Sequence, residues 1–371
     1  MKVLLSIGVG SIHFDSAIPY LERVVDELVI ARAGIISCFT SRMATFVGKL
    51  CNGGDNVRQM AWSMCGSASI RLLDGVNILH VRSGAGRGGA IRAARARGMK
   101  VLVDHSALHP DQCEANLKDD CKRWNVPLPI ASHRGVWKNV MKDCAEADIL
   151  MVNANHIRDS FVERGYDPKK VRVVYLGVRD DFRDVTIRRL ESGEKNDVPR
   201  VLFTGNFSLL KGAEYLLESL RILNERGVKV HYDVVGAINA PKALMAKYRD
   251  LPVSFYGHVP QNNLKRFIAN SDIYLFPSLA DGCAQSGMEA LAAGLPVVAT
   301  YQSGLPIRDG ETGCVVPMKD AAAIAEKIEW LISCPDERER FGKKASQTMK
   351  ECYGWMRYAE GVKKVYAEMS E

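Results

Sequence analysis

The stretch IYLFPSLADGCAQSGMEALAAGLPVVAT, residues 273–300, decides the fold of this chain. It begins with a short apolar run, Ile273–Phe276, that predicts a strand ending in a loop. A run of small residues at Gly287–Ala293 then predicts a helix, and Pro296–Ala299 predicts a second strand. A strand, a helix and another strand in close succession are typical of the βαβ unit of a parallel sheet.

The same alternation extends in both directions along the chain. Short runs rich in Val, Ile and Leu predict strands, and the stretches between them predict helices. The other expected strands are Lys2–Ile7, Gly34–Thr40, Val76–Val81, Lys100–Val103, Ile149–Asn153, Val171–Leu176, Arg200–Thr204, Val228–Val235 and Val253–Tyr256. The other expected helices are Ala17–Ala33, Ala90–Arg97, His133–Ala147, Ile157–Arg164, Ala213–Glu225, Asn262–Ala269 and Ala321–Ser333. We therefore expect an α/β protein with parallel sheets covered on both faces.

A polar segment at residues 181–199 interrupts this alternation, and its charges are of both signs. The chain has 371 residues, which suits two domains because domains commonly contain about 100–200 residues. We expect one Rossmann-like domain over residues 1–180, a linker over 181–199 and a second Rossmann-like domain over 200–353. Ligands should bind beyond the carboxyl ends of the strands.

Composition narrows the classes of partner. The net charge is +7, and residues 1–185 hold 26 Lys and Arg against 20 Asp and Glu. The basic cluster Arg92, Arg95, Arg97 and Lys100 predicts either a solvated helix face or a peripheral contact with an anionic membrane surface. No nucleic acid is expected as a partner, because no basic run is interleaved with aromatic residues.

The ten cysteines form no CxxC pair, which is typical of free thiols in a reducing cytoplasm. No apolar stretch approaches the roughly 18–20 residues of a membrane span. The expected location is therefore cytoplasmic, with a peripheral position at the inner face of the membrane as the alternative.

A first candidate binding loop is FTGNFSLLKG, residues 203–212. A strand ends in Gly205 and Asn206, and Lys211 with Gly212 opens a helix. The amide groups at the start of a helix favour phosphate, and the lysine adds a mobile cation. The alternative is a solvated lysine with no ligand.

A second candidate binding loop carries Asp281 and, in the helix that follows, Glu289. The amides of Gly282, Cys283 and Ala284 are expected to form an anion-binding nest between these two carboxylates. Such a set suits a sugar nucleotide, with the nest on the diphosphate and the carboxylates on sugar and ribose hydroxyls. The alternative is a capped helix in which Glu289 pairs with a nearby cation.

The second half of the chain resembles the donor-binding domain of family 4 of the retaining glycosyltransferases (glycosyl transferases group 1), which have the GT-B fold. The resemblance covers residues 201–349. The matching residues are Gly205, Lys211-Gly212, Pro277-Ser278, Asp281-Gly282, Glu289-Ala290, Ala292 and the run from Gly294 to Thr300. The sequence departs from the family pattern at Asn206, where an arginine is usual, at Asp281, where a glutamate is usual, and at residues 283–286.

The resemblance implies a metal-independent enzyme that needs no cofactor. The enzyme would transfer a sugar, with retention of configuration, from a UDP- or GDP-linked donor to a hydroxyl of a sugar or lipid-linked acceptor. Bacterial polysaccharide or glycolipid assembly is the implied setting. The two parallel sheets would face each other across a cleft. Residues 1–180 would be the acceptor-side domain and 200–353 the donor domain, and residues 354–371 would form a helix that returns to the first domain.

The resemblance also implies a role for each candidate residue. Lys211 and the amides of residues 282–284 would hold the diphosphate, and Glu289 would hold the ribose. Asp281 would hold the transferred sugar, and His109 would lie on the opposite wall. The expected catalytic residues are Asp281, His109 and Lys211. The expected donor-binding residues are Gly10, Gly205, Asn206, Lys211, Gly282, Cys283, Ala284 and Glu289.

Several alternatives stay open from the sequence. Two concern function: a GT-B nucleotide-sugar isomerase, and a non-catalytic nucleotide-sugar-binding protein. A third is a GxGxxG pattern at residues 84–89, followed by Asp104, which has the form of a dinucleotide-binding loop. The fourth is a metal site at His105 and His109, although no third ligand is evident.

Overall fold

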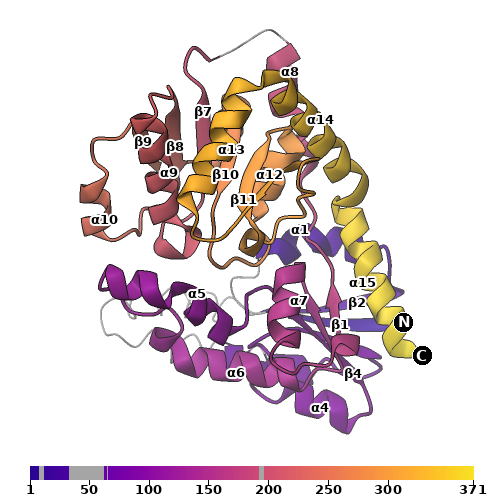
Figure 1. Ribbon diagram of the computed structural model, residues 1–371. Coiled ribbons are helices and arrows are strands. Elements are labelled where there is room, and N and C mark those ends of the chain that lie inside the picture. Colours follow the sequence, from indigo (N-terminus) through magenta and orange to yellow (C-terminus); the bar gives the residue numbers. More distant parts are fainter. Residues whose placement is uncertain (8–11, 33–61, 65, 192–195) are drawn as a thin grey trace. The chain divides into compact units, whose positions relative to one another are not determined.

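The computed structural model describes residues 1–7, 12–32, 62–64, 66–191 and 196–371. These residues form two compact units. Unit 1 contains residues 1–110, 129–175 and 355–371, and unit 2 contains residues 111–128 and 176–354. Each unit has its own parallel sheet, labelled in Figure 1.

The sheet of unit 1 has six parallel strands in the order β2-β1-β3-β4-β5-β6. Their bounds are β1 Lys2–Ile7, β2 Glu27–Arg32, β3 Ile78–Arg82, β4 Lys100–His105, β5 Ile149–Val152 and β6 Val171–Val173. The middle strands are almost entirely buried, which explains why they read as continuous apolar runs in the sequence.

Helices cover this sheet. The helices of unit 1 whose bounds the structure describes are α1 Ile12–Leu21, α4 Ala90–Ala96, α6 Arg134–Ala145, α7 Asn155–Val162 and α15 Trp355–Ser370. Helices α4 and α6 pack on β4, α7 packs on β5 and β6, and α15 packs along α1. In Figure 1 the last helix, in yellow, lies beside the N-terminal strands of its own unit.

The helix expected over residues 17–33 is wrong. Helix α1 ends at Leu21, and residues 27–32 form strand β2 instead. The apolar residues Leu28, Val29 and Ile30 pair in register with Leu4 and its neighbours on β1. Strand pairing therefore overrides the helical pattern of this segment. The strand expected over residues 34–40 lies outside the described residues.

The sheet of unit 2 also has six parallel strands, in the order β12-β11-β10-β7-β8-β9. Their bounds are β7 Arg200–Thr204, β8 His231–Val235, β9 Val253–Gly257, β10 Ile273–Phe276, β11 Val297–Thr300 and β12 Gly313–Val316. The chain crosses from β9 to β10 and from β7 to β8 through helices, as parallel pairing requires.

The helices of unit 2 pack on its sheet and on one another. Helix α9 (Ala213–Glu225) packs on α13 (Ala321–Ser333), which also covers β11 and β12. Helix α12 (Gln285–Ala293) packs on β10 and β11 and contacts α11 and α14. The remaining helices are α5 Pro110–Arg123, α8 Val185–Glu191, α10 Lys242–Lys247, α11 Gln261–Ala269 and α14 Pro335–Cys352.

The segment expected as a linker carries structure of its own. A 3₁₀ turn at Asp180–Phe182 and helix α8 occupy much of it. The Phe182 side chain is fully buried, and the Thr186 hydroxyl donates to the carbonyl of Ile268 at 3.1 Å. This segment therefore packs as part of unit 2. None of the helices in the described ranges has the length and apolar composition needed to cross a membrane.

Candidate active site

Two loops meet at the carboxyl ends of β7 and β10 in unit 2, which are neighbouring strands. The amide of Leu279 donates to the carbonyl of Leu210 at 2.9 Å, and the Ser278 hydroxyl donates to the same carbonyl at 3.1 Å. The loop after β7 is therefore fixed to the loop after β10. This is the edge at which open parallel sheets bind ligands.

Gly212 allows the close approach of these loops. It has a φ of +75° at the start of α9, and a Cβ atom placed there would lie 2.0 Å from the carbonyl oxygen of Pro277. A side chain at this position would meet both a backbone conformation that disfavours it and a backbone atom. The pair Lys211-Gly212 is thus held at a fixed distance from the second loop.

The structure brings Lys211 and Asp281 together. The ammonium group lies 2.5 Å from Oδ2 of Asp281 and 3.4 Å from the carbonyl of Ala280. It also lies 5.9 Å from the ring centre of Phe276. Each side chain of the pair is about one fifth exposed, with 18% for both. The two residues are 70 positions apart in sequence, so only the fold explains their contact.

The expected nest of three amides is only partly open. The Gly282 amide donates to Oδ1 of Asp281 at 2.6 Å, and the Ala284 amide donates to the carbonyl of Ser303 at 3.2 Å. The Asp281 carboxylate therefore occupies one of the positions predicted for a ligand. Cys283 is buried, and burial raises the pKa of its thiol to about 12, so this side chain stays a neutral thiol.

Glu289 lies in helix α12 and is 6% exposed. Burial raises the pKa of its carboxyl group to about 7, while the nearby cations Arg179 and Lys265 oppose that shift. The carboxyl group accepts no hydrogen bond from the described residues. Because buried polar groups normally have partners, this carboxyl group is suited to accept hydrogen bonds from a ligand.

Gly205 and Asn206 lie at the end of β7. Gly205 has a φ of +132°, and its amide donates to the carbonyl of Val235 at 2.9 Å. The side-chain oxygen of Asn206 accepts from Nδ2 of Asn239 at 2.6 Å. Asn206 is therefore already bonded to a neighbouring loop of the same unit. An arginine at this position could not accept this hydrogen bond, because its side chain has only donors.

His109 belongs to unit 1, where its ring packs edge-to-face on Phe161 with the centroids 5.2 Å apart. It is 8% exposed. Gly10 lies outside the described residues. His105 is buried in the same unit and packs on the same ring, with its centroid 5.2 Å from that of Phe161. Its Nδ1 lies 2.8 Å from the Ser83 hydroxyl, and burial lowers the pKa of the imidazole to about 3.

The glycine-rich loop at residues 84–89 is filled by a carboxylate of the protein itself. The amides of Gly84 and Gly86 donate to Oδ2 of Asp143 at 2.7 and 2.9 Å. A Cβ atom at Gly86 would lie 2.6 Å from the same carboxyl group. Asp143 therefore takes the position that a dinucleotide phosphate would need, and the dinucleotide interpretation is wrong.

The sequence allowed a cation near Glu289 as an alternative but did not identify Arg179 and Lys265 as the cations. Arg179 and Lys265 both pair with Asp181, which lies in the segment expected as a linker. The mixed charges of that segment were the available signal. Among the described residues, no group of three or more His, Cys, Asp or Glu side chains could hold a metal ion. In the basic cluster of unit 1, Arg95 pairs with Asp148 and Arg97 with Asp74.

Comparisons with known proteins bear on this site. Residues 184–348 match the family model described as glycosyl transferases group 1. The chain is 32% identical to a D-inositol 3-phosphate glycosyltransferase of Streptomyces scabiei over 284 residues, 66% of this chain and 63% of that protein. It is 27% identical to the amylovoran biosynthesis glycosyltransferase AmsK of Erwinia amylovora over 193 residues, 49% of this chain and 46% of that protein. The chain thus spans less than two thirds of the length of either relative.

The fold has a counterpart over the whole chain. The structure of Anabaena HepE in complex with UDP and glucose superposes with a TM-score of 0.66 at 15% identity, covering 99% of this chain and 100% of that one. Two units, each with a parallel six-stranded sheet, are the architecture of the GT-B glycosyltransferase fold. Residues 184–348, which carry Lys211, Asp281 and Glu289, belong to the glycosyl transferases group 1.

Proposed function

We propose that this protein is a glycosyltransferase that moves a sugar from a UDP- or GDP-linked donor to a hydroxyl of a sugar or lipid-linked acceptor, with retention of configuration and without a metal ion. The observation that carries the proposal is the Lys211–Asp281 pair, held where two loops meet at the carboxyl edge of a group 1 domain. The relative AmsK, named for amylovoran biosynthesis, supports polysaccharide assembly as the setting.

Lys211 is suited to stabilise the negative charge that develops on the diphosphate during transfer. When the bond to the sugar breaks, negative charge grows on the departing diphosphate. A cation held in place before the reaction stabilises that charge without reorganisation. Asp281 keeps the ammonium group at the loop junction in the absence of donor, and in our proposal the carboxylate turns to the sugar hydroxyls when the diphosphate takes over the ammonium.

Glu289 is suited to accept hydrogen bonds from the hydroxyls of the donor's ribose. Its nearly buried carboxyl group has acceptor capacity that no described residue uses, and it lies in the helix that follows the Asp281 loop. Lys211 supplies the positive charge that a divalent cation would otherwise supply, which is the reason for proposing metal independence. Retention is proposed from the resemblance of the Asp281–Glu289 motif to retaining enzymes.

The test is a transfer assay with UDP- and GDP-sugars and simple glycoside acceptors, read by NMR of the product. We expect a product with the anomeric configuration of the donor and a rate that EDTA does not change. Lys211→Met should lower kcat by about a hundredfold or more. Lys242→Met, at an exposed lysine of the same unit, should leave kcat unchanged.

Four results would overturn parts of this proposal. An inverted product would exclude retention, and loss of activity in EDTA would exclude metal independence. Conversion of the donor alone into an isomeric nucleotide sugar would replace transfer by isomerisation. Nucleotide binding without turnover for any acceptor tested would favour a non-catalytic binding protein.

A further inference from the structure

Unit 2 contains a polar cavity at the edge of its sheet opposite to the candidate active site. Its volume is about 550 Å³, and its lining includes Arg200, Asp233, Asn263, Arg266, Phe267 and Asn270. Strand β7 begins at Arg200 and ends next to Gly205, so the cavity lies at the amino edge. The length of the strand separates the two sites by roughly 16 Å. The volume lies within the range of about 300–1,000 Å³ that is typical of small-molecule sites.

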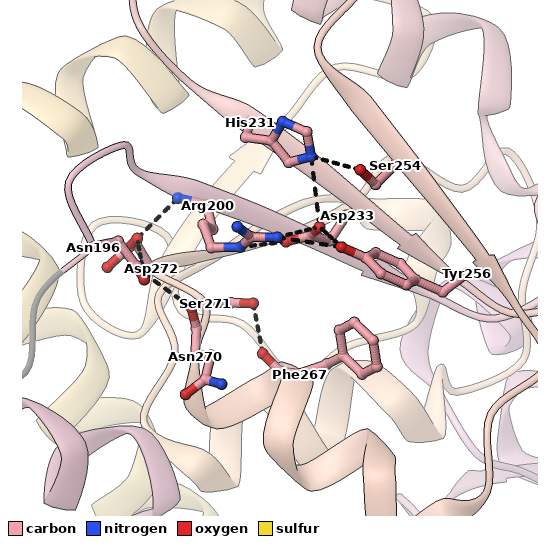
Figure 2. Close-up of polar contacts among 10 residues, drawn as sticks. All are labelled: Asn196, Arg200, His231, Asp233, Ser254, Tyr256, Phe267, Asn270, Ser271 and Asp272. Carbon is pink, nitrogen blue, oxygen red and sulfur yellow. Dashed lines mark hydrogen bonds and ion pairs between the residues drawn. The ribbon is translucent and has the colours of Figure 1, made fainter.

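One wall of the cavity is rigid. The guanidinium of Arg200 donates two hydrogen bonds to the carboxylate of Asp233, both at 2.7 Å, and the Tyr256 hydroxyl donates to the same carboxylate at 2.9 Å. Asp233 is 1% exposed. Figure 2 shows Arg200, Asp233 and Tyr256 in a row, with Ser271 and Phe267 across from them. The Arg200–Asp233 pair is therefore neutral as a whole and fixed in position.

The other wall carries polar groups that are available to a ligand. The side chains of Asn263, Arg266 and Asn270 are exposed. Within the part of the chain that the structure describes, they make no side-chain hydrogen bond or ion pair. Because the charges of Arg200 and Asp233 cancel, the lining of the cavity has a net charge of +1, which is the charge of Arg266. The cavity thus offers a ligand one cation and two carboxamides that no described residue engages, while its third carboxamide, Asn196, already donates to Asp272 and to the carbonyl of Asn270.

The cavity is also lined by an aromatic residue, Phe267, which packs against Tyr256. The rings of Tyr256 and Phe267 pack at 63° with their centroids 4.6 Å apart, and Tyr256 is 41% exposed. An aromatic face offers an apolar contact to the C–H groups of a flat, otherwise polar molecule. A molecule that has both many hydroxyl groups and an apolar ring face is a sugar.

We propose that this cavity binds a saccharide that carries a carboxylate group, at a site separate from the donor site of the proposed function. Arg266 binds the carboxylate through paired N–H donors. Asn263 and Asn270 exchange hydrogen bonds with the ring hydroxyls, and Phe267 lies against the ring. The site would hold an acidic sugar or a residue of an acidic glycan on the enzyme.

The experiment is a calorimetric titration of the full chain with glucuronate, beside glucose and inorganic phosphate. We expect glucuronate to bind and glucose to bind at least about tenfold more weakly, because one charge-assisted contact is lost. Arg266→Gln should weaken glucuronate binding by a similar factor. The matched control Arg249→Gln, at an exposed arginine of the same unit, should not change it. Replacing both Asn263 and Asn270 by Ala should weaken glucuronate binding and leave any phosphate binding unchanged.

Absence of glucuronate binding, or binding that Arg266→Gln does not change, would overturn the proposal. Phosphate that binds as tightly as glucuronate and competes with it would show a simple anion site and would also overturn it. The outcome is independent of the proposed transfer reaction. Lys211→Met should abolish transfer and keep glucuronate binding, whereas Arg266→Gln should keep transfer to a small acceptor.

Discussion

Glu289 titrates near neutral pH because it is buried among charges of both signs. Burial raises the pKa of its carboxyl group from 4.5 to about 7, so between these values the folded state binds more protons than the unfolded state. Stability then falls as pH rises through this window, and above pH 7 the cost is fully present, at about 3 kcal/mol. Glu289→Gln removes this cost. The advantage of the variant over the wild type in free energy of unfolding should therefore grow as the pH rises from 5 to 8.

Denaturant unfolding of both proteins at pH 5, 6.5 and 8 checks this prediction. The comparison with the variant matters because burial also raises the pKa of Asp143 to about 7. Asp143 is present in both proteins, so its contribution cancels in the difference. A difference in the free energy of unfolding that does not change with pH would contradict the assignment of this titration to Glu289. Separately, nucleotide affinity should fall in the variant, because the amide accepts ribose hydroxyls less well than a carboxylate.

Helix α9 offers a matched pair of glycines, one at each of its ends. Gly212 precedes the helix and Gly227 follows it, and both have a φ of +75°. A Cβ atom at Gly212 would lie 2.0 Å from the carbonyl oxygen of Pro277, whereas one at Gly227 would meet nothing within 4 Å. Gly227→Ala should therefore cost only about 1 kcal/mol of backbone strain. Gly212→Ala should cost about 3 kcal/mol or more, because the two active-site loops must also separate.

Thermal unfolding of the two variants measures these costs. Gly212→Ala should also lose nucleotide binding, because the position of Lys211 depends on this contact. Equal destabilisation by both substitutions would show that the contact between the loops contributes little.

The sequence predicted some elements to the residue and missed others, in both units. The bounds of β7, α9, β10 and α13 agree with the expectation residue for residue, because each is a complete apolar or amphipathic run between turn residues. The error at residues 17–33 arose because β2 is short and follows α1 closely. Helix α5, at Pro110–Arg123, was missed because much of it is polar.

The candidate site was predictable in its position and not in its internal contacts. Lys211 and Asp281 each follow a strand of the same parallel sheet, so the rule for carboxyl edges places them together. Their direct pairing, and the donation of the Gly282 amide to Asp281, depend on loop conformations that no pattern in the sequence encodes. The same is true of Asp143, which fills the glycine-rich loop from a helix that lies more than 50 positions further along the chain.

At the scale of the whole molecule, the last helix completes unit 1. Nδ1 of His80 on β3 and the hydroxyl of Tyr366 on α15 form a hydrogen bond of 2.7 Å, and both side chains are fully buried. Tyr366→Phe leaves a buried imidazole nitrogen without its partner. The substitution should lower the free energy of unfolding by about 1–3 kcal/mol. Tyr20→Phe on α1, where the tyrosine is only half-buried, should have almost no effect.

Differential scanning calorimetry measures the unfolding of both variants. The loss of stability in Tyr366→Phe is expected in the unfolding transition of unit 1. Nucleotide binding to unit 2 should stay the same. An unchanged unfolding profile for Tyr366→Phe would show that this hydrogen bond contributes no net stability.

The order in which the chain passes between its units has a consequence for synthesis on the ribosome. All of unit 2 precedes residue 355, whereas unit 1 needs the final helix, Trp355–Ser370. The nascent chain can therefore finish its second unit while the first still lacks a part of its core, with the buried surface that Tyr366 and Val362 cover left open to water. Premature termination near residue 354 would release a chain whose first unit is aggregation-prone, although its second unit is complete.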